Sequence, residues 1–173
     1  MLLNTKKVAM AGLLLAINVV LMILSTTIES SSLFFIAAAS FCLGIVIREW
    51  GLKFGIAFLM ASVILNLLVA PNKLYCVTLA GMELYLFLTE WLWRKIAEHP
   101  TMNKRNWKLW IGKFIIFNAI YLPILLLTKK FTEESVVIVW AAGQIVFLIY
   151  DYAYRYFQGR IWNKLRKETF KFL

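Results

Sequence analysis

The sequence predicts an all-α, polytopic membrane protein with six transmembrane helices and both termini in the cytoplasm. Hydrophobic residues make up 62% of the 173 residues and charged residues 16%, whereas a soluble domain carries roughly a quarter charged residues. The apolar residues fall into blocks of membrane-spanning length that short charged segments separate. We therefore expect a multi-pass protein of a bacterial cell (plasma) membrane.

Six apolar blocks are the expected spans, at 8–24, 33–47, 54–69, 74–93, 109–127 and 136–154. The first block is longer than the apolar part of a usual signal peptide and precedes no Ala-x-Ala cleavage pattern, so we interpret it as a helix of the mature protein. The second block is short for a full crossing, although its small residues allow close packing and its polar flanks allow it to span. The third ends at Ala70-Pro71-Asn72, since proline cannot continue a helix.

Between these blocks, the segment 48–53 is expected to be a turn, and residues 155–173 are expected to form a separate basic tail. The tail alternates basic residues with aromatic or aliphatic ones, which is typical of an amphipathic helix at a membrane surface. The sequence therefore predicts two parts, a six-helix transmembrane domain at 1–154 and a cytoplasmic tail at 155–173.

The distribution of basic residues predicts the orientation. Of the 19 lysines and arginines, all but Lys73, Lys129 and Lys130 fall on the N-terminus, the second and fourth connections and the tail, when Lys113 at the edge of the fifth block is counted with the fourth connection. Basic residues favour the cytoplasmic side, so both termini are expected there. Of the seven tryptophans, all but Trp140 flank the same side, where indole rings favour the membrane interface.

Several classes of function lack support in the sequence. The net charge of +10 is explained by membrane topology rather than by nucleic-acid binding, because the basic residues lie between apolar blocks. Cys42 and Cys76 have no CxxC spacing, and His99 is the single histidine, so no metal site is expected. No catalytic motif and no nucleotide-binding loop occurs. We expect no enzyme activity, no catalytic residues and no cofactor.

Glu83 is the most informative residue, because a carboxylate inside a membrane span is costly and normally faces the bundle interior or a wet cavity. Polar groups on three further spans lie at similar depth, toward the outside. These predicted substrate-binding residues are Glu83, Asn66, Asn118, Tyr121 and Gln144. They either converge on a pocket open to the exterior or serve only to hold helices together. Glu90 and Asp151 lie nearer the basic side and are expected to be charge-paired structural residues.

The first span carries small residues at four-residue spacing, Gly12 and Ala16, with Ala9 nearby, in the stretch KKVAMAGLLLAINVVL. Such spacing lets another helix approach closely, and that helix could belong to the protein itself. The stretch, together with the six-helix plan and the REWGLKFG segment, resembles the substrate-binding S components of energy-coupling factor (ECF) vitamin transporters. In that family the small residues of the first helix dock on a shared transmembrane coupling subunit.

The resemblance implies a membrane subunit that captures a vitamin-like molecule on its outer half and works with the coupling subunit and two ATPase subunits. Glu83 would then anchor the substrate, with the other polar residues fixing its orientation. The alternative is a non-transporting assembly or scaffold protein of the MreD-like cell-shape group, in which Glu83 is structural and the basic tail recruits a cytoplasmic partner.

Overall fold

The computed structural model describes residues 2–97, 105–128 and 136–164. It divides into two compact units, Met1–Ile124 and Leu125–Leu173. The described residues form six α-helices, which confirms the predicted all-α class. They are α1 (Leu2–Thr27), α2 (Ser32–Trp50), α3 (Leu52–Val69), α4 (Lys73–Ala97), α5 (Arg105–Thr128) and α6 (Val136–Tyr156), with a 3-10 turn η1 (Glu29–Ser31) and a π-helix η3 (Phe157–Trp162).

Five described segments are long and apolar enough to cross a membrane: Thr5–Thr27, Glu29–Trp50, Leu52–Val69, Trp107–Leu126 and Val137–Trp162. Their outward surfaces are apolar, with Leu13, Phe34 and Leu68 exposed to 63%, 70% and 76%. A protein in water would bury more of this surface, so these helices are those of a multi-pass membrane protein. α4 does not meet the same criterion, because Glu83 and Glu90 interrupt its apolar run.

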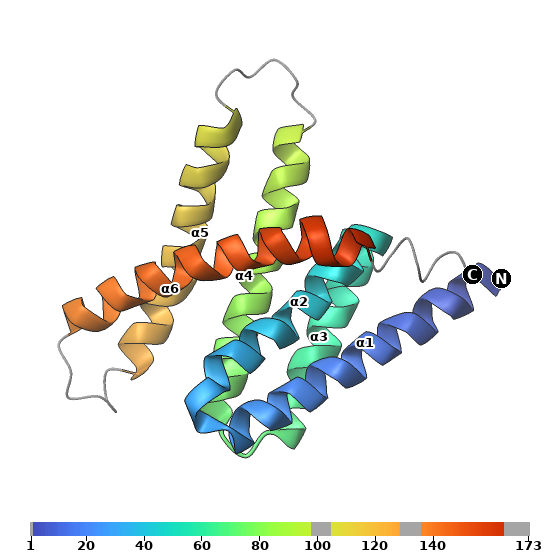
Figure 1. The fold of residues 1–173 in the computed structure, drawn as a ribbon, viewed down its shortest axis with the longest axis horizontal. Helices are drawn as coiled ribbons and strands as arrows, with labels where there is room; N and C mark the ends of the chain where they lie inside the picture. Colours follow the sequence, from blue (N-terminus) through green and yellow to red (C-terminus); the bar gives the residue numbers. More distant parts are fainter. Residues whose placement is uncertain (1, 98–104, 129–135, 165–173) are drawn as a thin grey trace. The chain divides into compact units, whose positions relative to one another are not determined.

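The first unit is built around α2, which packs against α1, α3 and α4 (Figure 1). Most of the second half of α2 is buried, including Ile47 and Leu43. The connection to α3 is the single residue Gly51, whose φ of +90° favours glycine. The turn is therefore shorter than expected from the sequence, since Arg48 and Trp50 still belong to α2, which makes this helix longer than its apolar block.

α5 packs along the face of α4 that carries Gly81 and Tyr85. A Cβ on Gly81 would lie 3.0 Å from Ile124 Cδ1, and the Tyr85 ring meets the Phe117 ring edge-on at 6.4 Å. Gly112 similarly lies against a leucine side chain farther along α4. α4 therefore has two covered faces, one toward α5 and one toward the remaining helices of the unit.

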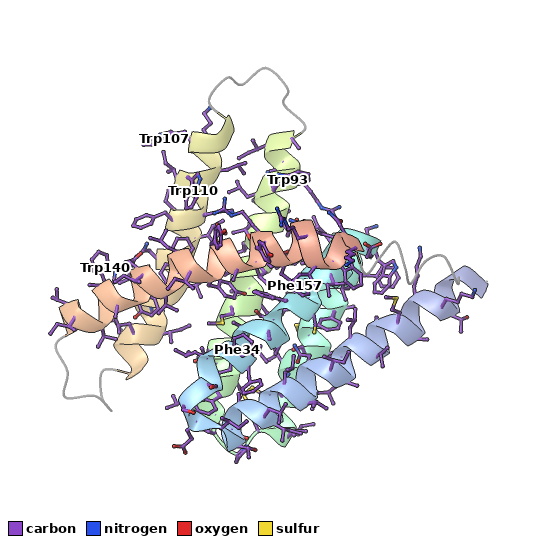
Figure 2. All side chains as sticks on the ribbon, in the orientation of Figure 1. Phe34, Trp93, Trp107, Trp110, Trp140 and Phe157 are labelled. Carbon is purple, nitrogen blue, oxygen red and sulfur yellow. The ribbon has the colours of Figure 1, made fainter. Side chains whose placement is uncertain are left out.

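An ion pair and a hydrogen bond join α2 and α4 at the end of the bundle that includes Gly51. We call the residues that make these contacts, Arg48, Glu90 and Arg94, the charged clasp. Arg48 Nη2 lies 2.8 Å from Glu90 Oε1, and Arg94 Nη2 donates to the carbonyl of Ile47 at 2.7 Å. The expected charge pairing of Glu90 is thus confirmed. At this end of α4 and α5 lie Trp93, Trp107 and Trp110 (Figure 2), all exposed, as expected for indole rings at a membrane interface.

In the second unit, α6 continues directly into η3, so the helix extends past the expected start of the tail at residue 155. Asp151 is buried and pairs with Arg155 at 3.1 Å, which confirms its expected charge pairing. Gln158 and Trp162 of η3 are also buried. Residues 165–173 of the tail lie outside the described residues.

Candidate functional site

Glu83 lies on the face of α4 that points into the bundle and is fully buried, with 0% of its surface exposed. Leu79, Leu86 and Glu90 are buried on the same face, at the spacing of helical turns. The carboxylate is therefore held inside the helix packing rather than at the lipid surface.

Two side chains from other helices donate hydrogen bonds to the same oxygen of Glu83. Asn18 Nδ2 on α1 donates to Glu83 Oε1 at 2.9 Å, and Ser62 Oγ on α3 donates to it at 2.7 Å. Both donors are themselves fully buried. Through one carboxyl oxygen, the two bonds link α1, α3 and α4.

Asn66, one turn along α3 from Ser62, completes the group. Its Nδ2 donates to Asn18 Oδ1 at 2.8 Å and to the carbonyl of Ser62 at 2.8 Å. Asn18 Nδ2 also donates to the carbonyl of Ala39 on α2, at 2.9 Å. We call Asn18, Ser62, Asn66 and Glu83 the Glu83 cluster; it contacts all four helices from α1 to α4.

Two acceptor atoms of the Glu83 cluster, Glu83 Oε2 and Asn66 Oδ1, are buried and have no hydrogen-bond partner among the described residues. Glu83 also has no ion-pair partner in that part of the chain. Buried polar groups are normally paired, and a buried charge is normally neutralised. With Glu83 ionised, the cluster is thus short of donors and of positive charge.

The structure brings together two of the five predicted substrate-binding residues, Glu83 and Asn66. Ser62 is hydrogen-bonded to both of them. Gln144 lies on α6, which belongs to the second unit. The convergence of Gln144 with these two residues remains a prediction.

Asn118 and Tyr121 lie on α5, which packs on another face of α4. Tyr121 stacks on Phe117 at 5.1 Å, and Phe117 contacts Tyr85 of α4. Tyr85 is two residues from Glu83, so the two side chains leave the helix about 200° apart. Asn118 donates to the carbonyl of Phe114 in its own helix. The structure does not place these two residues beside the Glu83 cluster.

The predicted docking residues Ala9, Gly12 and Ala16 are all exposed along one side of α1. A Cβ added to Gly12 would meet no atom within 4 Å. The opposite side of α1 carries the buried residues Leu14 and Asn18. Within the first unit, the small residues therefore do not serve helix packing.

Asn18 and Ser62 were not selected from the sequence. Asn18 interrupts the apolar run of the first span about two turns before it ends, a depth comparable to that of Glu83, so the argument from depth could have found it. Ser62 gives no such signal, because a serine in a membrane helix can bond to its own backbone.

Comparison of the chain with protein-family models, with curated proteins and with solved structures finds no match. Within the described residues, no group of three or more histidine, cysteine, aspartate or glutamate side chains could hold a metal ion. The candidate site is therefore identified from its side chains alone, which are one carboxyl group, two amides and a hydroxyl inside an apolar bundle.

Proposed function

We propose that the protein is the substrate-capture subunit of an ECF-type importer, with six spans, cytoplasmic termini and the Glu83 cluster as part of its binding site. The observation that carries the proposal is the pair of unpartnered acceptors, Glu83 Oε2 and Asn66 Oδ1. A cluster that only held helices together would gain from satisfying every buried acceptor, because each unpaired one costs about 1–3 kcal/mol. Binding sites tolerate this cost because a ligand satisfies the groups.

A second observation supports docking on a coupling subunit. The exposed small-residue side of α1, with Ala9, Gly12 and Ala16, offers close backbone approach to a helix of another protein. Under this proposal the coupling subunit contacts that side of α1, and two ATPase subunits act through it. The captured molecule would be vitamin-like in size and would enter from the outer side.

One observation favours the alternative, a scaffold protein without a substrate. All four residues of the Glu83 cluster are at most 1% exposed, and their bonds tie α1, α2, α3 and α4 together. Polar groups that link helices in this way occur in membrane proteins without any ligand. The scaffold would bind a cytoplasmic partner through its basic tail.

Co-purification distinguishes the two functions. The tagged chain, expressed in its native membrane, is expected to carry a multi-pass coupling subunit and two ATPase subunits, identified by mass spectrometry. In parallel, purified protein is screened for thermal stabilisation by vitamins and related metabolites. A complex that lacks ATPases, together with no stabilising compound, would favour the scaffold.

A further inference from the structure

The Glu83 cluster lacks hydrogen-bond donors and not acceptors. Asn18 Nδ2 uses its two N–H groups on the Ala39 carbonyl and on Glu83 Oε1. Asn66 Nδ2 reaches Asn18 Oδ1 and the Ser62 carbonyl, and the Ser62 hydroxyl donates to Glu83 Oε1. The atoms left over are two acceptors. A group that completes this site beside an ionised Glu83 must therefore donate at least two hydrogen bonds.

The cluster also lacks a positive charge. Lys73, at the start of α4, donates instead to the carbonyls of Leu67 and Ala70, at 2.6 and 3.1 Å. Arg48 pairs with a different glutamate at the other end of the bundle. An ionised carboxylate in an apolar interior is stable only when a cation or strong donors compensate it. A ligand of Glu83 is therefore expected to supply a positive charge as well as donors.

An apolar cluster adjoins this site on the side of the α3–α4 turn. Its members come from α1, α2, α4 and the residue that follows α3. They are Met22, Ile36, Ala39, Ala70, Cys76 and Leu79. Met22 is one turn beyond Asn18, and Leu79 is one turn before Glu83. Its members are at most 6% exposed, so a ligand that reached Glu83 from this end would displace part of this packing and place its remaining atoms against apolar side chains, of which methionine adapts best.

We propose that the Glu83 cluster binds the protonated amine, or an equivalent cationic N–H group, of a small amphipathic molecule whose apolar part lies against the cluster around Met22. This inference rests on the proposed capture function and adds the charge class of the substrate. The cationic group donates to Glu83 Oε2 and Asn66 Oδ1. Acidic molecules are excluded, since a second carboxylate beside Glu83 would be repelled in a medium of low dielectric constant.

The test uses a matched series of probes on the full-length protein in lipid nanodiscs. The probes are 2-phenylethylamine, which is a cation at pH 7, 2-phenylethanol, which is neutral, and 3-phenylpropanoate, which is an anion. Thermal unfolding and equilibrium binding are measured for the wild type and for Glu83→Gln. Glu29→Gln is the control, since it removes an exposed carboxylate outside the cluster.

The amine is expected to raise the unfolding midpoint of the wild type and of Glu29→Gln by roughly 5 °C at about 100 times its Kd. Glu83→Gln is expected to weaken its binding at least tenfold. The alcohol and the acid are expected to bind at least tenfold more weakly than the amine. Equal stabilisation by the acid, or an amine effect that survives Glu83→Gln, would overturn the proposal.

Three further outcomes distinguish a failure of the charge class from a failure of the capture or importer function. If sodium chloride, compared with choline chloride, gives the full Glu83-dependent stabilisation, the site holds a bare cation and the substrate class is wrong. If the metabolite screen yields an acidic ligand that needs Glu83, the capture function stands and the charge class fails. If the amine binds through Glu83 but no ATPase subunits co-purify, the charge class stands and the importer function fails.

Discussion

Asn18 and Glu83 are 65 residues apart in the chain and are joined by a 2.9 Å hydrogen bond inside the bundle. The bond connects α1 to α4, and the same amide reaches α2 through the carbonyl of Ala39. Asn18 Oδ1 accepts from Asn66 on α3 as well. One asparagine thus uses both of its donors and its acceptor on three other helices, and it links Glu83 to all of them.

Replacement of Asn18 by alanine is expected to destabilise the protein by about 2–4 kcal/mol, because several buried groups lose a partner together and a cavity remains. The measurement is reversible chemical unfolding of the purified protein in mixed micelles. The matched control is Asn163→Ala, which removes an exposed amide that bonds only to Gly159 within its own helix in the described contacts. A loss below about 0.5 kcal/mol for Asn18→Ala, equal to the control, would contradict the role of this asparagine.

Gly51→Ala is expected to cost about 1–3 kcal/mol, because φ is +90° and ψ is 177° at this residue, a region that only glycine adopts readily. The matched substitution Gly12→Ala is made inside a helix, where no atom lies within 4 Å of the added Cβ. It should leave stability unchanged or raise it by up to about 1 kcal/mol. Only Gly51→Ala should therefore lower the unfolding free energy; an equal loss in both variants would show that backbone conformation does not decide the result.

The clasp between α2 and α4 can be measured by a double-mutant cycle on Arg48 and Glu90. Arg48→Met leaves the buried Glu90 carboxylate without this partner, and Glu90→Gln removes the negative charge from the pair. Each change is expected to lower the unfolding free energy by about 1–2 kcal/mol, since the arginine is half exposed. The double variant should lose less than the sum of the two by about 1 kcal/mol. Additive losses would show that the 2.8 Å contact contributes no pairwise energy.

Gly12→Leu tests the predicted docking side of α1. The side chain would extend into open space in the isolated protein, so unfolding of the purified chain should be unchanged within about 0.5 kcal/mol. If a coupling subunit packs on this side, the bulky residue should abolish co-purification of that subunit, because close helix contacts need small residues. Leu13→Ala, at a neighbouring exposed position, is the control for a general effect on this surface. Unchanged co-purification in Gly12→Leu would place the docking surface elsewhere.

The helical class and the position of most spans could be predicted because apolar blocks and helix-ending residues are local features of the sequence. Pro71 follows the end of α3, as expected. The clasp residue Glu90 could be predicted for a similar reason, since its depth along α4 places it among basic residues. The turn at 48–53 was expected to be longer than the single residue Gly51, because charged residues at a helix end resemble a loop in sequence.

The composition of the candidate site could be predicted only in part, because depth along a helix says nothing of which face a neighbour covers. Glu83 and Asn66 share both depth and neighbours, and they belong to one cluster. Tyr121 has a suitable depth, but its helix packs on the Tyr85 face of α4. Hydropathy does not reveal Asn18, because one amide in a long apolar run has little effect on it, whereas its depth along the first span matches that of Glu83.

The central claim is that Glu83 is present for binding and costs stability in the free protein, and the unfolding free energy of Glu83→Gln tests it most directly. Glutamine has the same shape and can still accept from Asn18 and Ser62 while removing an uncompensated buried charge. We predict that ligand-free Glu83→Gln is as stable as the wild type or more so, and that it is no longer stabilised by the amine probe. A loss of about 2 kcal/mol or more without ligand, with no ligand effect in the wild type, would show that Glu83 serves only to hold the helices together.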